Sequence, residues 1–217
     1  MKQIVSMSRL TNQLEKMFRL LNQDFFNNEL ETPIITVVPS SRSYAHYTPW
    51  SAWQSKDTYR REINIASGTL DRPLEAITAS LLHEMVHMYN DLVLNIQDCS
   101  RGGTYHSKIF KEQAEAHGLL CFRTDKYGWS RTAPSDMLLE WLLLHDELRE
   151  IEMCRVNPGY AAVGIGTHAS SSVPGFVATT ATTRQHSFRY QCPCCQAIAR
   201  SGKPIRLICG DCLQPMT

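Results

Sequence analysis

Two histidines four residues apart, with a glutamate beside the first, form the most reactive cluster of the sequence, His83-Glu84-Met85-Val86-His87. On a helix, residues i and i+4 lie one turn apart on the same face, so both imidazoles can bind one metal ion at about 2 Å. Glu84 lies about 100° around the helix from His83, where it can accept a proton from a metal-bound water instead of binding the metal. The pattern predicts a zinc site that hydrolyses amide bonds.

The element that must carry this motif is a helix beginning after Asp71, which is predicted to cap it, with Pro73 in the first turn. Its apolar residues recur at spacings of three and four, as on the buried face of a helix: Leu74, Ile77, Leu81, Met85, Met88 and Leu92. The motif lies in the middle of this helix and out of register with the apolar residues, which argues against a chance match. Ser80 and Ala76, one and two turns before His83 on its own face, are small and leave room beside the metal.

A catalytic zinc site needs a third protein ligand and an open fourth position. The downstream candidates are His106, Glu112, Glu115 and His117. His106 stands just before a predicted helix over 107–117 that Gly118 ends. His117 could instead complement the end of that helix, and the two glutamates could be solvated. Residue types and spacing alone leave the third ligand open.

Five of the eight cysteines lie in the last 26 residues, as Cys192-Pro-Cys-Cys195 and Cys209-Gly-Asp-Cys212. Four thiolates in two Cys-x-x-Cys pairs close a tetrahedral site with no open position, so they predict a structural zinc. Cys194 is the spare thiol, because Cys192 and Cys195 repeat the spacing of the second pair. A redox disulfide is the alternative, and it is disfavoured in a chain without a secretory signal.

The remaining patterns predict an α+β protein: a mainly helical, zincin-type domain with a short sheet, followed by a β zinc ribbon. Helices are predicted over 8–26 and after Pro134, where Leu138, Trp141, Leu148 and Ile151 would face inward, and strands over 33–38 and 62–66. The aromatic run 44–61 is interpreted as sheet core or, alternatively, as a surface that stacks bases. The predicted organisation is a catalytic domain over 1–154, a linker over 155–187 rich in Gly, Ala, Ser and Thr, and the ribbon over 188–217.

Composition and charge limit the setting of the protein. The chain is 43% hydrophobic and 20% charged, and it has neither a run of about 18 apolar residues nor a signal peptide. These features predict a cytoplasmic protein that does not enter a membrane, with association to a nucleoid or nucleus open. Residues 1–154 carry 16 Lys+Arg against 20 Asp+Glu, whereas 155–217 carry 6 against 1. Five basic residues lie in or near the ribbon: Arg184, Arg189, Arg200, Lys203 and Arg206. Phe188 and Tyr190 lie close to them in the sequence, and this combination of basic and aromatic residues predicts DNA as a partner.

Several segments together resemble the SprT-like metallopeptidase family, which is related to Spartan. They are Leu21-Asn22 with Phe25-Phe26-Asn27-Asn28-Glu29-Leu30, Glu62-Ile-Asn-Ile-Ala-Ser67, Leu81-Leu-His-Glu-Met-Val-His87 and His106-Ser-Lys-Ile-Phe110. The resemblance covers about residues 8–154 and continues into the ribbon. It implies a zinc endopeptidase with Glu84 as general base and His106, which opens the next helix, as third ligand after His83 and His87. It also implies action on DNA-bound or DNA-crosslinked proteins, as in DNA–protein crosslink repair.

Two other functions remain open at this point. One is a regulatory metalloprotease that cleaves a specific repressor. The other is a non-proteolytic zinc-ribbon adaptor that acts in transcription or DNA binding. The presence of Glu84 argues against the adaptor, because a purely structural metal site has no need of that carboxylate.

Overall fold

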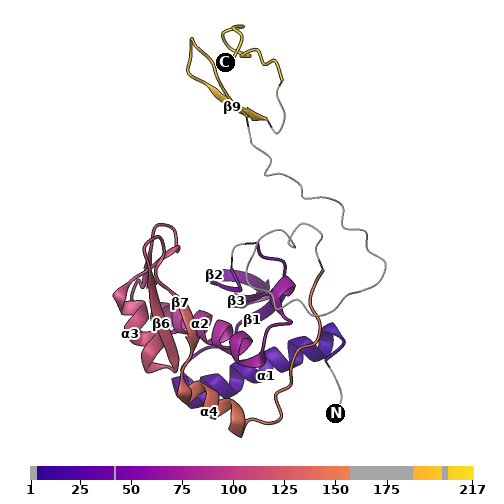
Figure 1. The fold of residues 1–217 in the computed structure, drawn as a ribbon, viewed down its shortest axis with the longest axis vertical. Coiled ribbons are helices and arrows are strands. Elements are labelled where there is room, and N and C mark those ends of the chain that lie inside the picture. Colours follow the sequence, from indigo (N-terminus) through magenta and orange to yellow (C-terminus); the bar gives the residue numbers. More distant parts are fainter. Residues whose placement is uncertain (1–3, 42, 157–187, 202–204) are drawn as a thin grey trace. The chain divides into compact units, whose positions relative to one another are not determined.

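The structure, a computed structural model, describes residues 4–41, 43–156, 188–201 and 205–217. The chain divides into two compact units, residues 1–161 and 162–217 (Figure 1). Most of the predicted linker (157–187) lies outside the described residues, so its boundaries at 154 and 188 stay predictions. No helix in the described ranges is long and apolar enough to cross a membrane.

The first unit begins with α1 (Met7–Phe26), which confirms the helix predicted from the 3.6-residue periodicity. One face of α1 is fully buried, including Leu10, Leu14 and Phe18. The helix ends at Asn27, whose left-handed conformation (φ 52°) and N–H bond to the Asn22 carbonyl stop the helical ladder.

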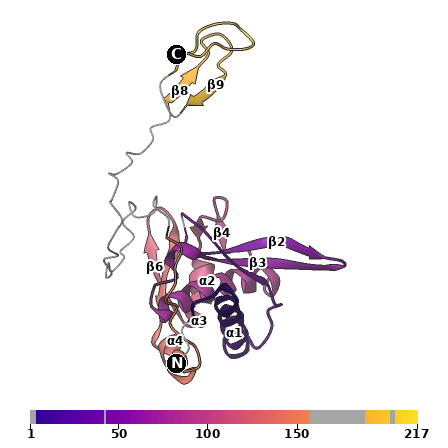
Figure 2. The same ribbon diagram turned by 90° about the vertical axis from the view of Figure 1, so that its right-hand side faces the viewer.

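A three-stranded sheet follows, formed by β1 (Ile34–Val38), β2 (Ala45–Ser55) and β3 (Thr58–Ala66) in the order β1-β3-β2. The strands predicted over 33–38 and 62–66 are confirmed, whereas β2 is an additional strand. It pairs antiparallel with β3 and forms one edge of the sheet. The far parts of β2 and β3 form a hairpin that extends from the body (Figure 2).

This hairpin corrects the sheet-core interpretation of the aromatic run. Tyr47 is buried, but Trp50, Trp53 and Tyr59 are 64%, 46% and 57% exposed. The reason is that every residue from 49 to 60 lies on the extended part of the hairpin, where neither face of the two strands is covered.

The helix that carries the histidine motif is α2 (Leu74–Leu92), and it lies between the two sheets of the unit, in contact with β2, β3 and β7. The prediction that Asp71 caps it was wrong. Pro73 is the N-cap residue, and no side chain bonds to the first N–H groups from that position. The predicted apolar stripe is confirmed, because Ile77, Leu81 and Met85 are fully buried.

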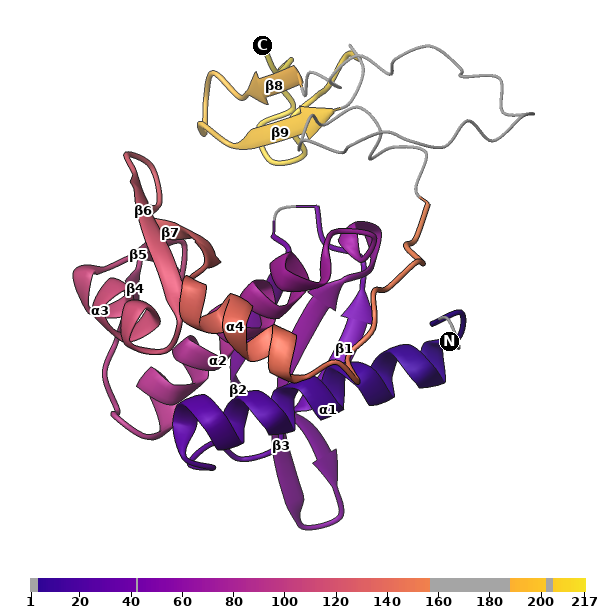
Figure 3. The same cartoon turned by 60° about the horizontal axis from the view of Figure 1, so that its bottom comes forward.

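The second sheet contains short strands in the order β4-β5-β7-β6: β4 (Cys99–Ser100), β5 (Tyr105–His106), β6 (Leu119–Thr124) and β7 (Gly128–Pro134). Between β5 and β6 runs α3 (Lys108–Ala116), the helix predicted over 107–117. The unit then adds α4 (Asp136–Leu144), which packs on the end of α1 through Trp141 and Phe25 (Figure 3). Leu148 and Ile151 are buried as predicted, but they follow the helix instead of belonging to it.

The second unit contains β8 (Phe188–Gln191) and β9 (Ile198–Ser201), an antiparallel pair joined by the first cysteine pair. Gln191 also exchanges two backbone hydrogen bonds with Thr217. The α+β class is therefore confirmed, with four α-helices and three small sheets in the described part of the chain.

Candidate active site and metal centres

Over residues 76–87 of α2, solvent reaches one face of the helix, and His83 and His87 lie on that face. Ala76, Ser80, His83 and His87 are partly accessible, whereas their neighbours 77–79, 81–82 and 84–86 are buried. The spacing of four, three and four residues defines this face, named here the accessible stripe of α2. The core on the opposite side of the helix fixes the direction in which both imidazoles point.

His106 reaches the same place from β5, and two local features position it. Ser107 caps α3 by accepting hydrogen bonds from the N–H groups of Ile109 and Phe110, so β5 passes directly into the helix. The His106 N–H donates to the Tyr127 carbonyl at 3.0 Å, next to Gly128 on β7. Gly128 has φ +65°, and a Cβ there would meet the His106 carbonyl oxygen, so only glycine fits.

The three rings meet through their Nε2 atoms. These atoms are 3.1 Å apart for His83–His106 and His87–His106, and 3.2 Å apart for His83–His87. Tetrahedral ligands about 2.05 Å from one ion would be about 3.3 Å apart, so the triangle has the size that one metal ion needs. Its fourth position is not occupied by a protein ligand among the described residues.

Hydrogen bonds at the other ring nitrogen of His83 and of His87 support this arrangement. His87 Nδ1 lies 2.8 Å from the Asp98 carboxylate, and His83 Nδ1 lies 3.0 Å from the Thr132 hydroxyl. A neutral ring that donates from Nδ1 carries its lone pair on Nε2, facing the other histidines. Converging lone pairs repel one another unless a cation lies between them, so these residues fit a bound metal ion.

Phe110 supplies the apolar side of the site. It is fully buried, and its ring lies 4.5 to 4.7 Å from the rings of His83, His87 and His106. Burial lowers the pKa of His83 well below its ordinary value and that of His106 to about 4, and the neighbouring His87 adds to both effects. Neutral imidazole is the form that binds metal, so this environment favours ligation.

Asp98 is the functional residue that the sequence analysis missed. The residue is 8% exposed, and its carboxylate accepts hydrogen bonds from His87 and from Asn90, the latter at 2.7 Å. Burial alone would lower the pKa of His87 and raise that of Asp98. The hydrogen bond and the charge attraction between these two residues outweigh burial, so the pKa of His87 is raised and that of Asp98 is lowered. Asp98 lies in the segment between α2 and β4, where an acidic residue carries no spacing signal of its own.

Glu84 is held beside the histidines with one carboxylate oxygen 2.8 Å from the Tyr47 N–H on the edge strand β2. It is 8% exposed, and burial raises the pKa of its carboxyl group, opposed by nearby His87 and His46 and by the Tyr47 bond. A carboxylate with a raised pKa is a better proton acceptor than one in water. The arrangement can therefore place a base next to a metal with an open position.

The remaining ligand candidates lie elsewhere. Glu112 and Glu115 are exposed and form ion pairs with Lys108 and Lys111 along α3. His117 stacks on Phe26 at 4.4 Å between ring centroids and bonds to the Gln113 carbonyl. These three residues act on the surface and at the end of α3, which leaves His106 as the histidine that joins the pair.

The C-terminal unit brings together Cys192, Cys195, Cys209 and Cys212, a group that can hold a metal ion. In each pair the backbone carbonyl of the first cysteine accepts a hydrogen bond from the N–H of the residue four positions later, Gln196 or Leu213. The backbone N–H of the same cysteine donates to the carbonyl of the residue five positions later. Gln196 and Leu213 also share a positive φ, 63° and 53°. The two loops therefore have the same backbone pattern, in which Cys195 corresponds to Cys212.

Cys194 is exposed and stands outside this group, so the register inferred from spacing matches the one that the backbone shows. Backbone hydrogen bonds from Cys195 and Cys194 lower the pKa of the Cys192 thiol to about 7, whereas hydrogen bonds with neighbouring thiols raise the pKa of Cys212 to about 12. A thiolate at neutral pH is the form that ligates a metal.

Comparisons with protein-family models, curated proteins and solved structures found no match to this chain.

Proposed function

We propose that the chain is a zinc-dependent endopeptidase with a zincin-type catalytic domain, similar to the SprT-like metallopeptidases. The observation that supports this most is the triangle of Nε2 atoms from His83, His87 and His106, 3.1 to 3.2 Å apart, with the Glu84 carboxylate on the same helix. Three imidazoles with an open fourth position are typical of catalytic zinc sites. Four thiolates would hold the second, structural zinc.

In this proposal Glu84 transfers protons, and the groups around the three imidazoles hold the metal ligands and the carboxylate in place. Zinc bound there supplies a lowered pKa for water and polarises the carbonyl that is attacked. Glu84 accepts the proton of the attacking water and donates it to the leaving amine. The Tyr47 N–H holds the carboxylate at the edge of β2, and Phe110 excludes water beneath the rings.

We further propose that the substrates are DNA-bound or DNA-crosslinked proteins in the cytoplasm, or at a nucleoid or nucleus, and that the ribbon recruits the enzyme to DNA. The support is the charge of 155–217, where six Lys+Arg stand against one acidic residue. Within the described part of the ribbon, Arg189 and Arg206 are exposed and Tyr190 is partly exposed. Cationic side chains beside an aromatic ring suit single-stranded nucleic acid.

The test combines metal analysis with cleavage of an unstructured protein. Two zinc ions per chain and measurable cleavage are expected for the wild-type protein. Glu84→Gln should keep both ions and lose about two to four orders of magnitude in turnover, because an amide cannot accept the proton. Glu112→Gln is the matched control, since it makes the same chemical change at an exposed position on α3. Normal turnover in Glu84→Gln would show that the site does not work in this way.

A further inference from the structure

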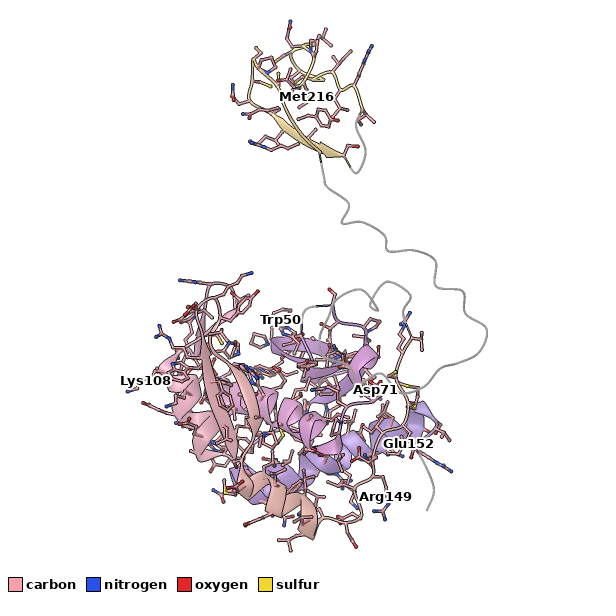
Figure 4. The ribbon with its side chains drawn as sticks, in the orientation of Figure 1. Trp50, Asp71, Lys108, Arg149, Glu152 and Met216 are labelled. Carbon is pink, nitrogen blue, oxygen red and sulfur yellow. The ribbon has the colours of Figure 1, made fainter. Side chains whose placement is uncertain are left out.

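Arg72 places a guanidinium group over the accessible stripe of α2. Its Nε donates to the Thr69 carbonyl at 2.9 Å, and Nη1 donates to the Ala76 carbonyl at 3.4 Å. Both Nη atoms lie 3.2 Å from the Ser80 hydroxyl, one turn before His83. The group also lies 4.0 Å above the ring of Tyr44, the residue just before β2. Its chain neighbour Asp71, which is labelled in Figure 4, lies in the segment before α2.

This cation has no carboxylate bound to it among the described residues. Arg61 on β3, by contrast, pairs with Glu31 at 3.2 Å and Asp91 at 3.5 Å. Burial lowers the pKa of Arg72, and the neighbouring Tyr44 and Asp71 offset only part of that effect. Nη2 carries two N–H donors, and within the described ranges only Ser80 accepts from it. A partly desolvated guanidinium with a spare donor is a binding site for an anion.

The distance along α2 sets which part of a substrate could reach Arg72. Ser80 and Ala76, which Arg72 contacts, precede His83 by three and seven residues, rises of about 4.5 and 10.5 Å along the helix. An extended peptide rises about 3.3 Å per residue, and its side chains point alternately to opposite sides. A side chain that points towards α2 two or three residues from the cleaved bond would lie beside the guanidinium.

We propose that Arg72 binds an acidic side chain of the cleaved polypeptide, two or three residues from the bond that is broken. This subsite rests on the proposed endopeptidase function and adds a specificity to it. Four protein groups hold the guanidinium in place (the Thr69 and Ala76 carbonyls, the Ser80 hydroxyl and the Tyr44 ring), so little side-chain freedom remains to be lost on binding.

Binding is measured with the zinc-loaded Glu84→Gln protein, which holds peptides without cleaving them, and with fluorescent peptides that carry Glu or Gln at each position in turn. At one or two positions the Glu peptide is expected to bind about tenfold more tightly, and the difference should shrink with salt. Adding Arg72→Gln should abolish the difference, and Arg72→Lys should keep part of it. Arg60→Gln is the control, because Arg60 also donates to a backbone carbonyl but lies on β3.

The outcomes separate the inference from the function on which it rests. If Glu and Gln peptides bind equally at every position, Arg72 is not an acid-binding residue, whatever the variants do. If an oligonucleotide, and not the acidic peptides, binds in an Arg72-dependent way, the subsite is for phosphate and the inference is wrong. Wild-type protein that binds acidic peptides through Arg72 but cleaves none would refute the endopeptidase and leave the subsite standing. Cleavage without a preference for acidic side chains would support the endopeptidase and refute the Arg72 subsite.

Discussion

At the residue scale, the candidate site depends on groups that orient two of the three imidazoles. Asp98 receives the Nδ1–H of His87 and is itself fixed by Asn90, while the Thr132 hydroxyl lies at Nδ1 of His83. These contacts direct the Nε2 lone pairs towards one point before any ion arrives. Part of the metal affinity should therefore come from residues that do not touch the metal.

We predict that Asp98→Asn lowers the affinity of the histidine site for zinc by about 10- to 100-fold. The amide keeps the size of the side chain but removes the charge that favours a proton on His87 Nδ1. Zinc affinity is measured by competition with a chelator in a protein that keeps its four ribbon cysteines. Asp125→Asn, an exposed change in the β6–β7 turn, should leave the affinity unaltered. Equal affinities in the two variants would mean that Asp98 does not position His87.

At the element scale, the position of the third ligand depends on how β5 passes β7. Gly128 is the point of closest approach, with the Tyr105 ring 3.0 Å from the place of a Cβ and the His106 carbonyl closer still. The hairpin turn before β5 contains another glycine, Gly103, with φ +82° and open space around it. The two positions share a left-handed backbone and differ in their surroundings.

We predict that Gly128→Ala destabilises the fold and reduces zinc bound to the histidine site, because the methyl group pushes β5 and His106 away from α2. Gly103→Ala should cost only the backbone strain of a left-handed alanine, about 1–2 kcal/mol, and keep the zinc. Thermal unfolding and zinc content are measured for both variants. A Gly128→Ala protein that matches Gly103→Ala in both quantities would contradict this account of how His106 is placed.

The elements also show what could be predicted from sequence. α1, α2 and α3 have strong periodicity or clear end signals, such as the Gly118 that follows α3. The predicted ranges of α1 and α3 and the apolar stripe of α2 were confirmed, whereas the predicted start of α2 was wrong. β2 and the outer part of β3 were missed because residues 49–60 are exposed on both faces and show no alternation. Asp98 and Arg72 could not be found from spacing, since each is brought to the site by the packing of a loop against α2.

At the scale of the whole molecule, charge and chemistry separate along the chain. The three histidines and Glu84 lie in unit 1–161, and the four cysteines lie in unit 162–217. Residues 1–154 have an excess of four acidic residues, whereas residues 155–217 have an excess of five basic residues. If the ribbon recruits the enzyme to DNA, catalysis and recruitment should be separable by changes in the second unit alone.

We predict that removing residues 188–217 leaves a folded protein that binds one zinc and still cleaves an unstructured substrate, while its affinity for single-stranded DNA falls. Phosphate contacts release counterions, so binding by the full chain should weaken steeply as salt rises. Replacing Arg189 and Arg206 with Gln in the full chain should keep both zinc ions and reduce the slope of log K against log salt by about 1.4. DNA titrations at several salt concentrations, run beside cleavage rates, measure these effects. Equal DNA affinity in the full and shortened chains would rule out recruitment by the ribbon and favour a protease directed at one specific protein.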